Sequence, residues 1–285
     1  MKVIKDRQFD AERSLYNESN LLLDNVIFAG DADGESALKE SSDITITDCS
    51  FKLRYPLWHA KRVNIERSIM TETCRAPLWY SDDINVNNSK FDGVKIFREC
   101  RNVNINKLQM TSSEAFWFTS NIKIKESEIT SEYGFLKTKN VMIDNLKFKG
   151  KYSFQYAENV EIRDSYLDTK DAFWEAKNVT VINSVIKGEY LGWYSKNLKL
   201  INCHIIGTQP LCYCEGLVME NCTMDEADFA FELSDVTASI NNNIISIKNP
   251  KAGSISVEGV DEVIIDIETS CKISINNRKK LENNN

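Results

Sequence analysis

Short triplets, in which two aliphatic residues flank one other residue, recur along most of the chain. They begin at Ile44, Val63, Ile84, Val103, Ile122, Val141, Val160, Val179, Leu198, Leu217 and Val236. From Ile84 onward the triplets recur at a constant period of nineteen, and the single step from Val63 to Ile84 is longer by two positions. Self-similarity at a constant period indicates a solenoid, in which each repeat packs mainly on its neighbours.

The repeat contains alternation of period two and no helical periodicity, which favours strands over helices. A second apolar row lies seven positions after each triplet start, and a third row lies thirteen positions after it. The third row contains Leu57, Leu78, Phe97, Phe116, Phe135, Phe154 and Phe173. Three apolar rows per repeat predict an all-β fold, a parallel β-helix with three short strands per coil.

Asparagine precedes the triplet in six consecutive repeats, at Asn102, Asn121, Asn140, Asn159, Asn178 and Asn197. Asn tolerates a left-handed backbone, which a tight corner requires, and stacked amides can bond to one another from coil to coil. We interpret this row as a folding device and expect no function from it.

The repeat resembles the pectin-lyase-like, single-stranded, right-handed β-helices. Within that class the segments "DGESALKE", "RYPLWH" and "RAPLWY" resemble an uncharacterised bacterial family, a domain of unknown function. The resemblance extends from Phe9 to about Asn277. It implies a fold and no established reaction, although β-helices of this class commonly bind polysaccharides on an outward sheet.

We expect one β-helix domain of about thirteen coils over residues 1–277. Residues 1–43 would form irregular N-terminal coils, residues 44–240 the regular repeats, and residues 241–277 the C-terminal coils. Residues 278–285 read as a polar tail.

The third row raises the question of which side chains face the core, because bulky residues stand next to one another there. Examples are Leu78-Trp79, Phe116-Trp117 and Phe173-Trp174. Side chains alternate between the two faces of a strand, so both members of a pair cannot point inward. Small residues two positions from each Trp favour the tryptophans inside and the phenylalanines outside.

The outward face would then carry an apolar spine of Phe edged by Tyr and charged groups, suited to stacking on and hydrogen bonding with sugars. The predicted binding residues are Arg54, His59, Arg75, Tyr80, Glu99, Glu114, Phe116, Tyr133, Phe135, Tyr152, Phe154, Asp171, Phe173, Glu175 and Tyr194. If the two rows are reversed, the site shifts to Trp58, Trp79, Arg98, Trp117, Gln155, Trp174 and Trp193. Arg54 and Arg75 could instead simply pair with Glu35 or Glu72.

A reaction is harder to predict than binding. We find no two carboxylates at the separation a glycosidase needs and no acidic cluster for Ca²⁺, so the sequence leaves open whether the protein is an enzyme. The favoured prediction is binding or processing of an oligosaccharide or polysaccharide. The alternatives are an interaction scaffold or homo-oligomer that uses the same face, and an enzyme of another kind.

Composition narrows the list of partners. The 285 residues are 42% apolar and carry a formal charge of -7, with no long basic cluster, which disfavours nucleic acid. No apolar run suits a membrane span or a secretory signal, so we expect a cytoplasmic protein with no membrane partner and reduced thiols at its eight cysteines. His59 and His204 fall on different sides of the coil, and no cofactor or metal site is expected.

Overall fold

The computed structural model describes residues 1–30 and 35–276, and these ranges contain strands and turns but no helix. The chain forms a parallel β-solenoid of about 14 turns with a spacing of about 19 residues. The predicted fold class is therefore confirmed. The polar tail predicted at 278–285 lies outside the described residues, as do the first two residues of the "DGESALKE" segment.

The chain divides into two compact units, Met1–Gly150 and Lys151–Asn285. The single domain expected for residues 1–277 stays a prediction. The described residues contain no helix with the length and apolar character needed to cross a bilayer.

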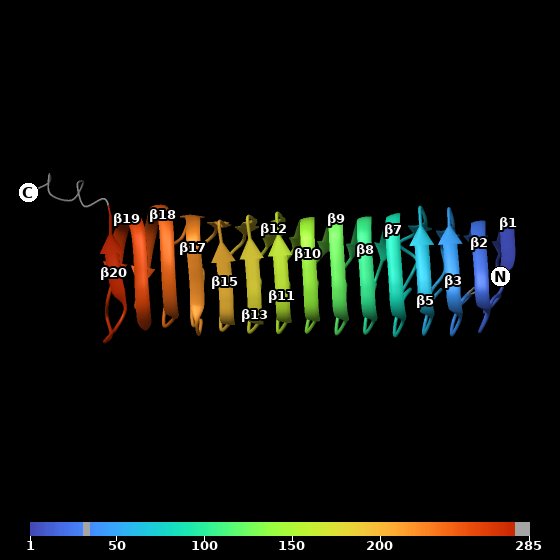
Figure 1. Ribbon diagram of the computed structural model, residues 1–285, viewed down its shortest axis with the longest axis horizontal. Helices are drawn as coiled ribbons and strands as arrows, with labels where there is room; N and C mark the ends of the chain where they lie inside the picture. Colours follow the sequence, from blue (N-terminus) through green and yellow to red (C-terminus); the bar gives the residue numbers. More distant parts are fainter. Residues whose placement is uncertain (31–34, 277–285) are drawn as a thin grey trace, which may run out of the picture. The chain divides into compact units, whose positions relative to one another are not determined.

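Unit 1 consists of parallel strands that follow one another from coil to coil (Figure 1). Two coils have two short strands each, β3 with β4 and β5 with β6, whereas β1, β2 and β7 to β10 are continuous strands that bend in the middle. Their bounds are β1 Lys2–Phe9, β2 Ser19–Phe28, β3 Ser42–Thr47, β4 Ser50–Phe51, β5 Lys61–Glu66, β6 Ile69–Met70, β7 Asp82–Gly93, β8 Arg101–Ser112, β9 Ser120–Ser131 and β10 Lys139–Gly150.

Unit 2 has the same construction, with every registered strand pair parallel. Its strands are β11 Glu158–Arg163, β12 Tyr166–Thr169, β13 Lys177–Ile182, β14 Val185–Lys187, β15 Lys196–Ile201, β16 His204–Ile206, β17 Leu217–Asp225, β18 Asp235–Lys248, β19 Ala252–Ile264 and β20 Lys272–Ile275.

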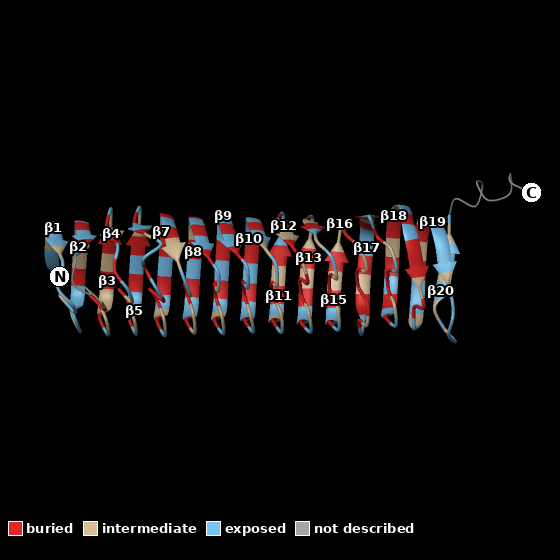
Figure 2. Ribbon diagram, turned by 180° about the vertical axis from the view of Figure 1, so that it is seen from behind, coloured by how far each residue is buried: buried red, intermediate tan, exposed pale blue. Residues whose placement is uncertain are grey.

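The register stacks like positions on like positions. Val103 pairs with Ile84 on one side and Ile122 on the other, and all three are buried. Buried and exposed residues alternate along the bent strands (Figure 2). The first two apolar rows therefore form the core that the triplets predicted.

The asparagine row forms the corner before the first strand in both units. Asn121 has φ +57°, and its Nδ2 donates to Oδ1 of Asn102 at 2.9 Å, while Nδ2 of Asn140 donates to Oδ1 of Asn121 at 3.0 Å. In unit 2, Nδ2 of Asn197 donates to Oδ1 of Asn178 at 3.0 Å. The predicted ladder of left-handed, amide-bonded corners is confirmed.

The third side of the coil is not a strand, which corrects the prediction of three strands per coil. In unit 1, left-handed residues alternate with other residues along it, as at Phe116 (φ +61°) and Phe118 (φ +58°). The N–H of Phe116 bonds to Ile96 O in the previous coil, and the N–H of Phe118 bonds to Leu136 O in the next. The coils therefore remain hydrogen-bonded here without β geometry.

The coil that contains β5 and β6 is slightly longer than its neighbours. Phe51 pairs with Met70 and Met70 pairs with Phe91, so the second step along the chain exceeds the first by two positions. The next registered pair, Arg75 with Val94, returns to the shorter step. The additional residues therefore lie between Met70 and Arg75, at the corner where the second side meets the third.

Candidate functional site

The phenylalanine row of the third side faces the core, so the predicted outward spine is wrong. Phe97, Phe116 and Phe135 in unit 1, and Phe154 and Phe173 in unit 2, have no exposed surface. Phe116 stacks on Phe135 with ring centroids 4.6 Å apart. The tryptophan row is half-buried and faces outward.

Alternating handedness explains the reversal. The prediction assumed a strand, in which neighbours point to opposite faces. With left-handed residues at every second position, the order becomes two inward residues and then two outward ones, as in Ala115-Phe116 followed by Trp117-Phe118. The small residues at the two ends were placed correctly, and only the middle pair was exchanged.

The outward row in unit 1 is a ladder of indoles and cations. The Nζ of Lys39 lies 4.5 Å from the Trp58 ring, Trp58 stacks on Trp79 at 5.9 Å, and the Arg98 guanidinium lies 5.3 Å from both Trp79 and Trp117. Cation–π contacts of this kind hold the side chains of Lys39 and Arg98 in this outward row.

This ladder is poorly suited to stacking on sugars, because its rings already cover one another's faces. Trp79 has Trp58 against one neighbouring coil and Arg98 against the other. The indole nitrogens of Trp58 and Trp79 are buried without a partner among the described residues, so they offer no donor at the surface. Mainly ring edges remain available to a ligand.

Several predicted residues do come together beside this ladder. His59 stacks on Tyr80 at 5.0 Å, and a hydrogen bond from Tyr80 to Glu99 raises the pKa of the tyrosine. Arg98 contacts carboxylate oxygens of both Glu99 and Glu114 at 3.4 Å. Because Arg98 forms an ion pair with each carboxylate, Glu99 and Glu114 are not free to act as a catalytic acid and base.

The remaining predicted residues differ in how far their side chains are buried. Arg54 pairs with Glu35, which confirms the simpler of its two interpretations. The exposed residues are Arg54, His59, Arg75, Tyr80, Tyr133, Glu175 and Tyr194; the half-buried ones are Glu99, Glu114 and Tyr152; the buried ones are Asp171 and the four phenylalanines. Burial raises the pKa of Asp171.

Unit 2 has its own outward aromatic cluster. Trp193 packs against Trp174 at 5.5 Å and meets the rings of Tyr190 and Tyr213 nearly edge-on, and its Nε1 donates to Gln209 O at 2.7 Å. Gln155 is half-buried on the same side of its coil. The rings of this cluster therefore also cover one another and leave little ring surface for a ligand.

The clearest concavity in unit 1 lies elsewhere, at the corner between the first and second sides of the coil. Left-handed residues bend the chain there: Arg67, Asn88, Lys107, Glu126 and Asn145, with φ between +44° and +54°. Small residues support the bend from inside. The Ser127 hydroxyl accepts from Leu108 N at 3.1 Å and donates to Lys125 O at 2.6 Å, which satisfies the backbone at the corner.

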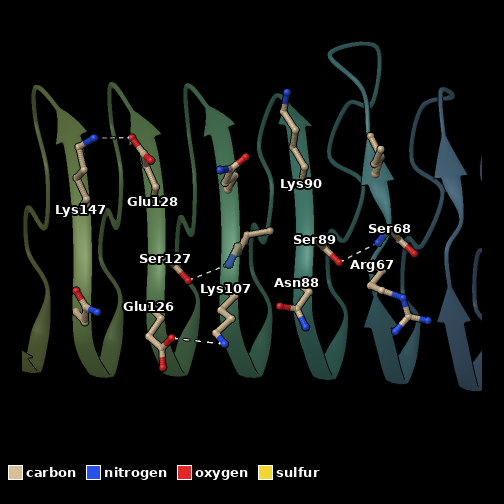
Figure 3. A pocket seen from close by; sticks show the side chains of 14 residues that line it. Arg67, Ser68, Asn88, Ser89, Lys90, Lys107, Glu126, Ser127, Glu128 and Lys147 are labelled. Carbon is tan, nitrogen blue, oxygen red and sulfur yellow. Dashed lines mark hydrogen bonds and ion pairs between the residues drawn. The ribbon is translucent and has the colours of Figure 1, made fainter.

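The bend leaves an open groove of about 700 Å³ that crosses five consecutive coils. Its lining side chains rise from one strand after another at the coil spacing (Figure 3). The corner row forms one part of the lining, and the outward row of the second side forms the other, with Ile69, Lys90, Gln109, Glu128 and Lys147.

Charges in the groove are arranged as ion pairs between adjacent coils. Lys147 lies 2.9 Å from Glu128, and Lys107 lies 3.7 Å from Glu126 (Figure 3). Beside the groove, hydrogen bonds from Asn88, Asn87 and Arg67 lower the pKa of Glu66, so this carboxylate stays ionised at neutral pH. The amides of Gln109 and Asn145 have no partner within the described part of the chain.

This groove was not predicted, because a corner between two strands was expected to be only a connection. The available signal was a row of long polar residues at a constant offset from the triplets, beside a second row of the same kind. A shelf of amides, Asn64, Asn85, Asn87, Asn104 and Asn106, lies next to it on the outward face of the first side.

The cysteines are unpaired, and seven of the eight are buried. Burial raises the pKa of Cys74 and of Cys212 to about 12 and that of Cys214 to about 11, so these thiols stay protonated at neutral pH. Within residues 1–30 and 35–276, no group of three or more His, Cys, Asp and Glu side chains could hold a metal ion.

Comparison with known proteins now identifies the family. The sequence model of the family described as "Protein of unknown function (DUF3737)" matches residues 2–276 of the chain. The chain belongs to this family. The resemblance to an uncharacterised β-helix family is thereby confirmed, and the DUF3737 match covers both units. No curated protein matches the chain.

Among the solved structures similar to the DUF3737 chain are an adhesin and an epimerase module. PfbA, a surface adhesin of Streptococcus pneumoniae, aligns with a TM-score of 0.40 and 12% identity over 91% of this chain and 75% of that chain. The A-module of the mannuronan C-5 epimerase AlgE6 from Azotobacter vinelandii aligns with a TM-score of 0.33 and 9% identity over 95% and 87% of the two chains.

Proposed function

We propose that unit 1 binds an extended carbohydrate chain in the groove at the corner between the first two sides of the coil. One observation carries the proposal: a hollow of about 700 Å³ in which polar side chains return at every coil. This volume lies within the range typical of ligand sites. A polymer of similar units could repeat its contacts from coil to coil.

The chemistry of the lining favours sugars over other polymers. Hydroxyl groups both donate and accept hydrogen bonds, and the groove offers amides, carboxylates and ammonium groups side by side. β8 and β9 are paired on both edges, so a peptide finds no free strand edge there. The cations are largely paired with acids, which disfavours a nucleic acid backbone.

Gln109 and Asn145 are the residues expected to bind the ligand most directly. Both are exposed, and neither amide has to give up a protein partner among the described residues. The Lys147–Glu128 and Lys107–Glu126 pairs would exchange part of their mutual contact for sugar hydroxyls. Because these pairs are exposed, the cost of loosening them is small, about 0–1 kcal/mol each.

The test is binding of the full chain to an array of oligosaccharides, followed by calorimetry with the best ligand. We expect the double substitution Gln109→Ala and Asn145→Gly to weaken binding about tenfold or more, because two hydrogen bonds of about 0.5–1.5 kcal/mol each are lost. Glycine is chosen at Asn145 because it keeps the left-handed backbone of the corner without strain. Lys177→Ala with Lys187→Ala, at exposed positions of unit 2, is the matched control and should bind normally.

Substitution of Trp79 by Ala distinguishes binding in the groove from binding on the indole ladder. If Trp79→Ala abolishes binding while the groove variant binds normally, the carbohydrate lies on the indole ladder and the groove assignment is wrong. If no oligosaccharide binds and light scattering instead shows a defined oligomer, the proposal fails in favour of the interaction scaffold.

A further inference from the structure

Three side chains that could form a nucleophilic site meet on the outward face of β16 and β17 in unit 2. The register places His204 beside Thr223 and Ile206 beside Asp225. The Nδ1 of His204 lies 2.7 Å from the Thr223 hydroxyl, and its Nε2 lies 3.3 Å from Oδ2 of Asp225. Both ring nitrogens thus have a polar neighbour: the Thr223 hydroxyl is hydrogen-bonded to Nδ1, and the Asp225 carboxylate lies at ion-pair distance from Nε2.

The neighbour of each ring nitrogen determines which nitrogen carries the proton. A carboxylate can only accept, so the neutral imidazole places its proton on Nε2, toward Asp225. Nδ1 is then left with its lone pair facing the hydroxyl. We infer that Thr223 is a nucleophile for acyl transfer, with His204 as its general base and Asp225 as the residue that positions the imidazole.

Asp225 is itself held in place. The Nδ2 of Asn242, on β18, donates to Asp225 Oδ1 at 3.2 Å and to Met224 O at 2.9 Å, and Asn242 Oδ1 accepts from Met224 N at 2.9 Å. The Asn242 amide is therefore fixed by the backbone at both ends. This supports a defined orientation for the carboxylate and, through it, for the imidazole.

The reaction that this arrangement can perform is hydrolysis of an ester. His204 takes the proton from the Thr223 hydroxyl as its oxygen attacks the ester carbonyl. The bond between the carbonyl carbon and the alkoxy oxygen then breaks as His204 gives the proton to the departing alcohol, and the acyl group remains on Thr223. Water attacks this second ester with help from the same base, which releases the carboxylic acid and restores the threonine hydroxyl.

The site is accessible to an ester of a large alcohol. The His204 side chain is 34% exposed and that of Asp225 is 56% exposed, so the site lies open at the surface. Asn221 is exposed two positions before Thr223 on β17, where its amide can donate to the developing oxyanion.

The experiment uses the full chain and 4-nitrophenyl acetate as the probe ester, with mass spectrometry of the chain after phenylmethylsulfonyl fluoride. We expect release of nitrophenol above the rate of Thr223→Val, and a sulfonyl adduct on Thr223. His204→Gln should lower kcat about 100-fold or more, the usual contribution of a general base. Thr237→Val, a threonine substitution elsewhere in unit 2, is the control and should leave the rate unchanged.

Further variants separate catalysis from structure. Thr223→Ser keeps the hydroxyl and should retain activity. If Thr223 mattered only because its methyl group packs against neighbours, this variant would lose activity. Asp225→Asn should lower kcat with little change in KM, because it affects the orientation of the base and not binding. Equal rates for the unsubstituted chain and Thr223→Val, or an adduct that maps to other residues only, would overturn the inference.

Discussion

At the scale of single residues, backbone handedness decides which side chains fill the core. Phe135 has φ +63° and no exposed surface, while the next residue, Leu136, is half-buried on the outward side. A bulky residue in the left-handed region is uncommon and is stable only where its surroundings enforce it. Here the buried rings of neighbouring coils do so, since Phe116 stacks on Phe135.

Substitution at these two adjacent positions provides a direct check. Phe135→Ala should lower the free energy of unfolding by about 3–5 kcal/mol, because it leaves a cavity in the stack. Leu136→Ala, the matched control, should cost about 1 kcal/mol or less. Urea unfolding followed by circular dichroism measures both. A larger loss for Leu136→Ala would reverse the inward and outward assignments again.

Residue identity explains why the core of two sides could be predicted and that of the third could not. Val and Ile in the triplets indicate strands, and strands fix alternation. The same alternation was expected on the third side. Its left-handed positions hold residues such as Phe97, Phe116, Tyr194 and Leu211, and none of them within the described ranges is β-branched. Val, Ile and Thr are strongly disfavoured at positive φ, so their absence was a usable signal.

At the scale of elements, corners and bends organise both the fold and the groove. The Asn corner was predictable because Asn, Asp and Gly all tolerate a left-handed backbone. The second corner has the same signal at Asn88 and Asn145 but not at Arg67, Lys107 and Glu126, which take positive φ because neighbouring coils and the serine ladder enforce it. Residue preferences therefore mark the corner on which the groove depends only in part.

Substitution of Asn121 tests the corner. Asn121→Gly and Asn121→Ala both lose the two amide bonds to the neighbouring coils, but only alanine is strained at φ +57°. We expect the alanine variant to be less stable than the glycine variant by about 1–2 kcal/mol, as measured by thermal unfolding. Equal stability of the two variants would show that handedness at this corner costs little.

At the scale of the molecule, each coil of unit 1 packs mainly on its two neighbours, so the number of coils is not fixed by the fold. Removal of residues 103–121 joins Asn102 to Ile122 and reproduces the natural Asn121-Ile122 junction. The shortened chain should fold, with the same β-type circular dichroism and a single unfolding transition at lower temperature. Removal of residues 103–112 alone should instead disrupt folding, because it joins a corner to the middle of a coil.

The longer coil of unit 1 has a practical consequence for protein engineering. Four residues between Met70 and Arg75 occupy the corner that two residues occupy in the coils on either side, and the rows beyond them return to register. Glu72 and Thr73 are exposed, and the Thr73 hydroxyl holds the loop to Lys52 O at 2.7 Å. The corner already accommodates added chain, which makes it the natural point for grafting an epitope, a protease site or a second folded module.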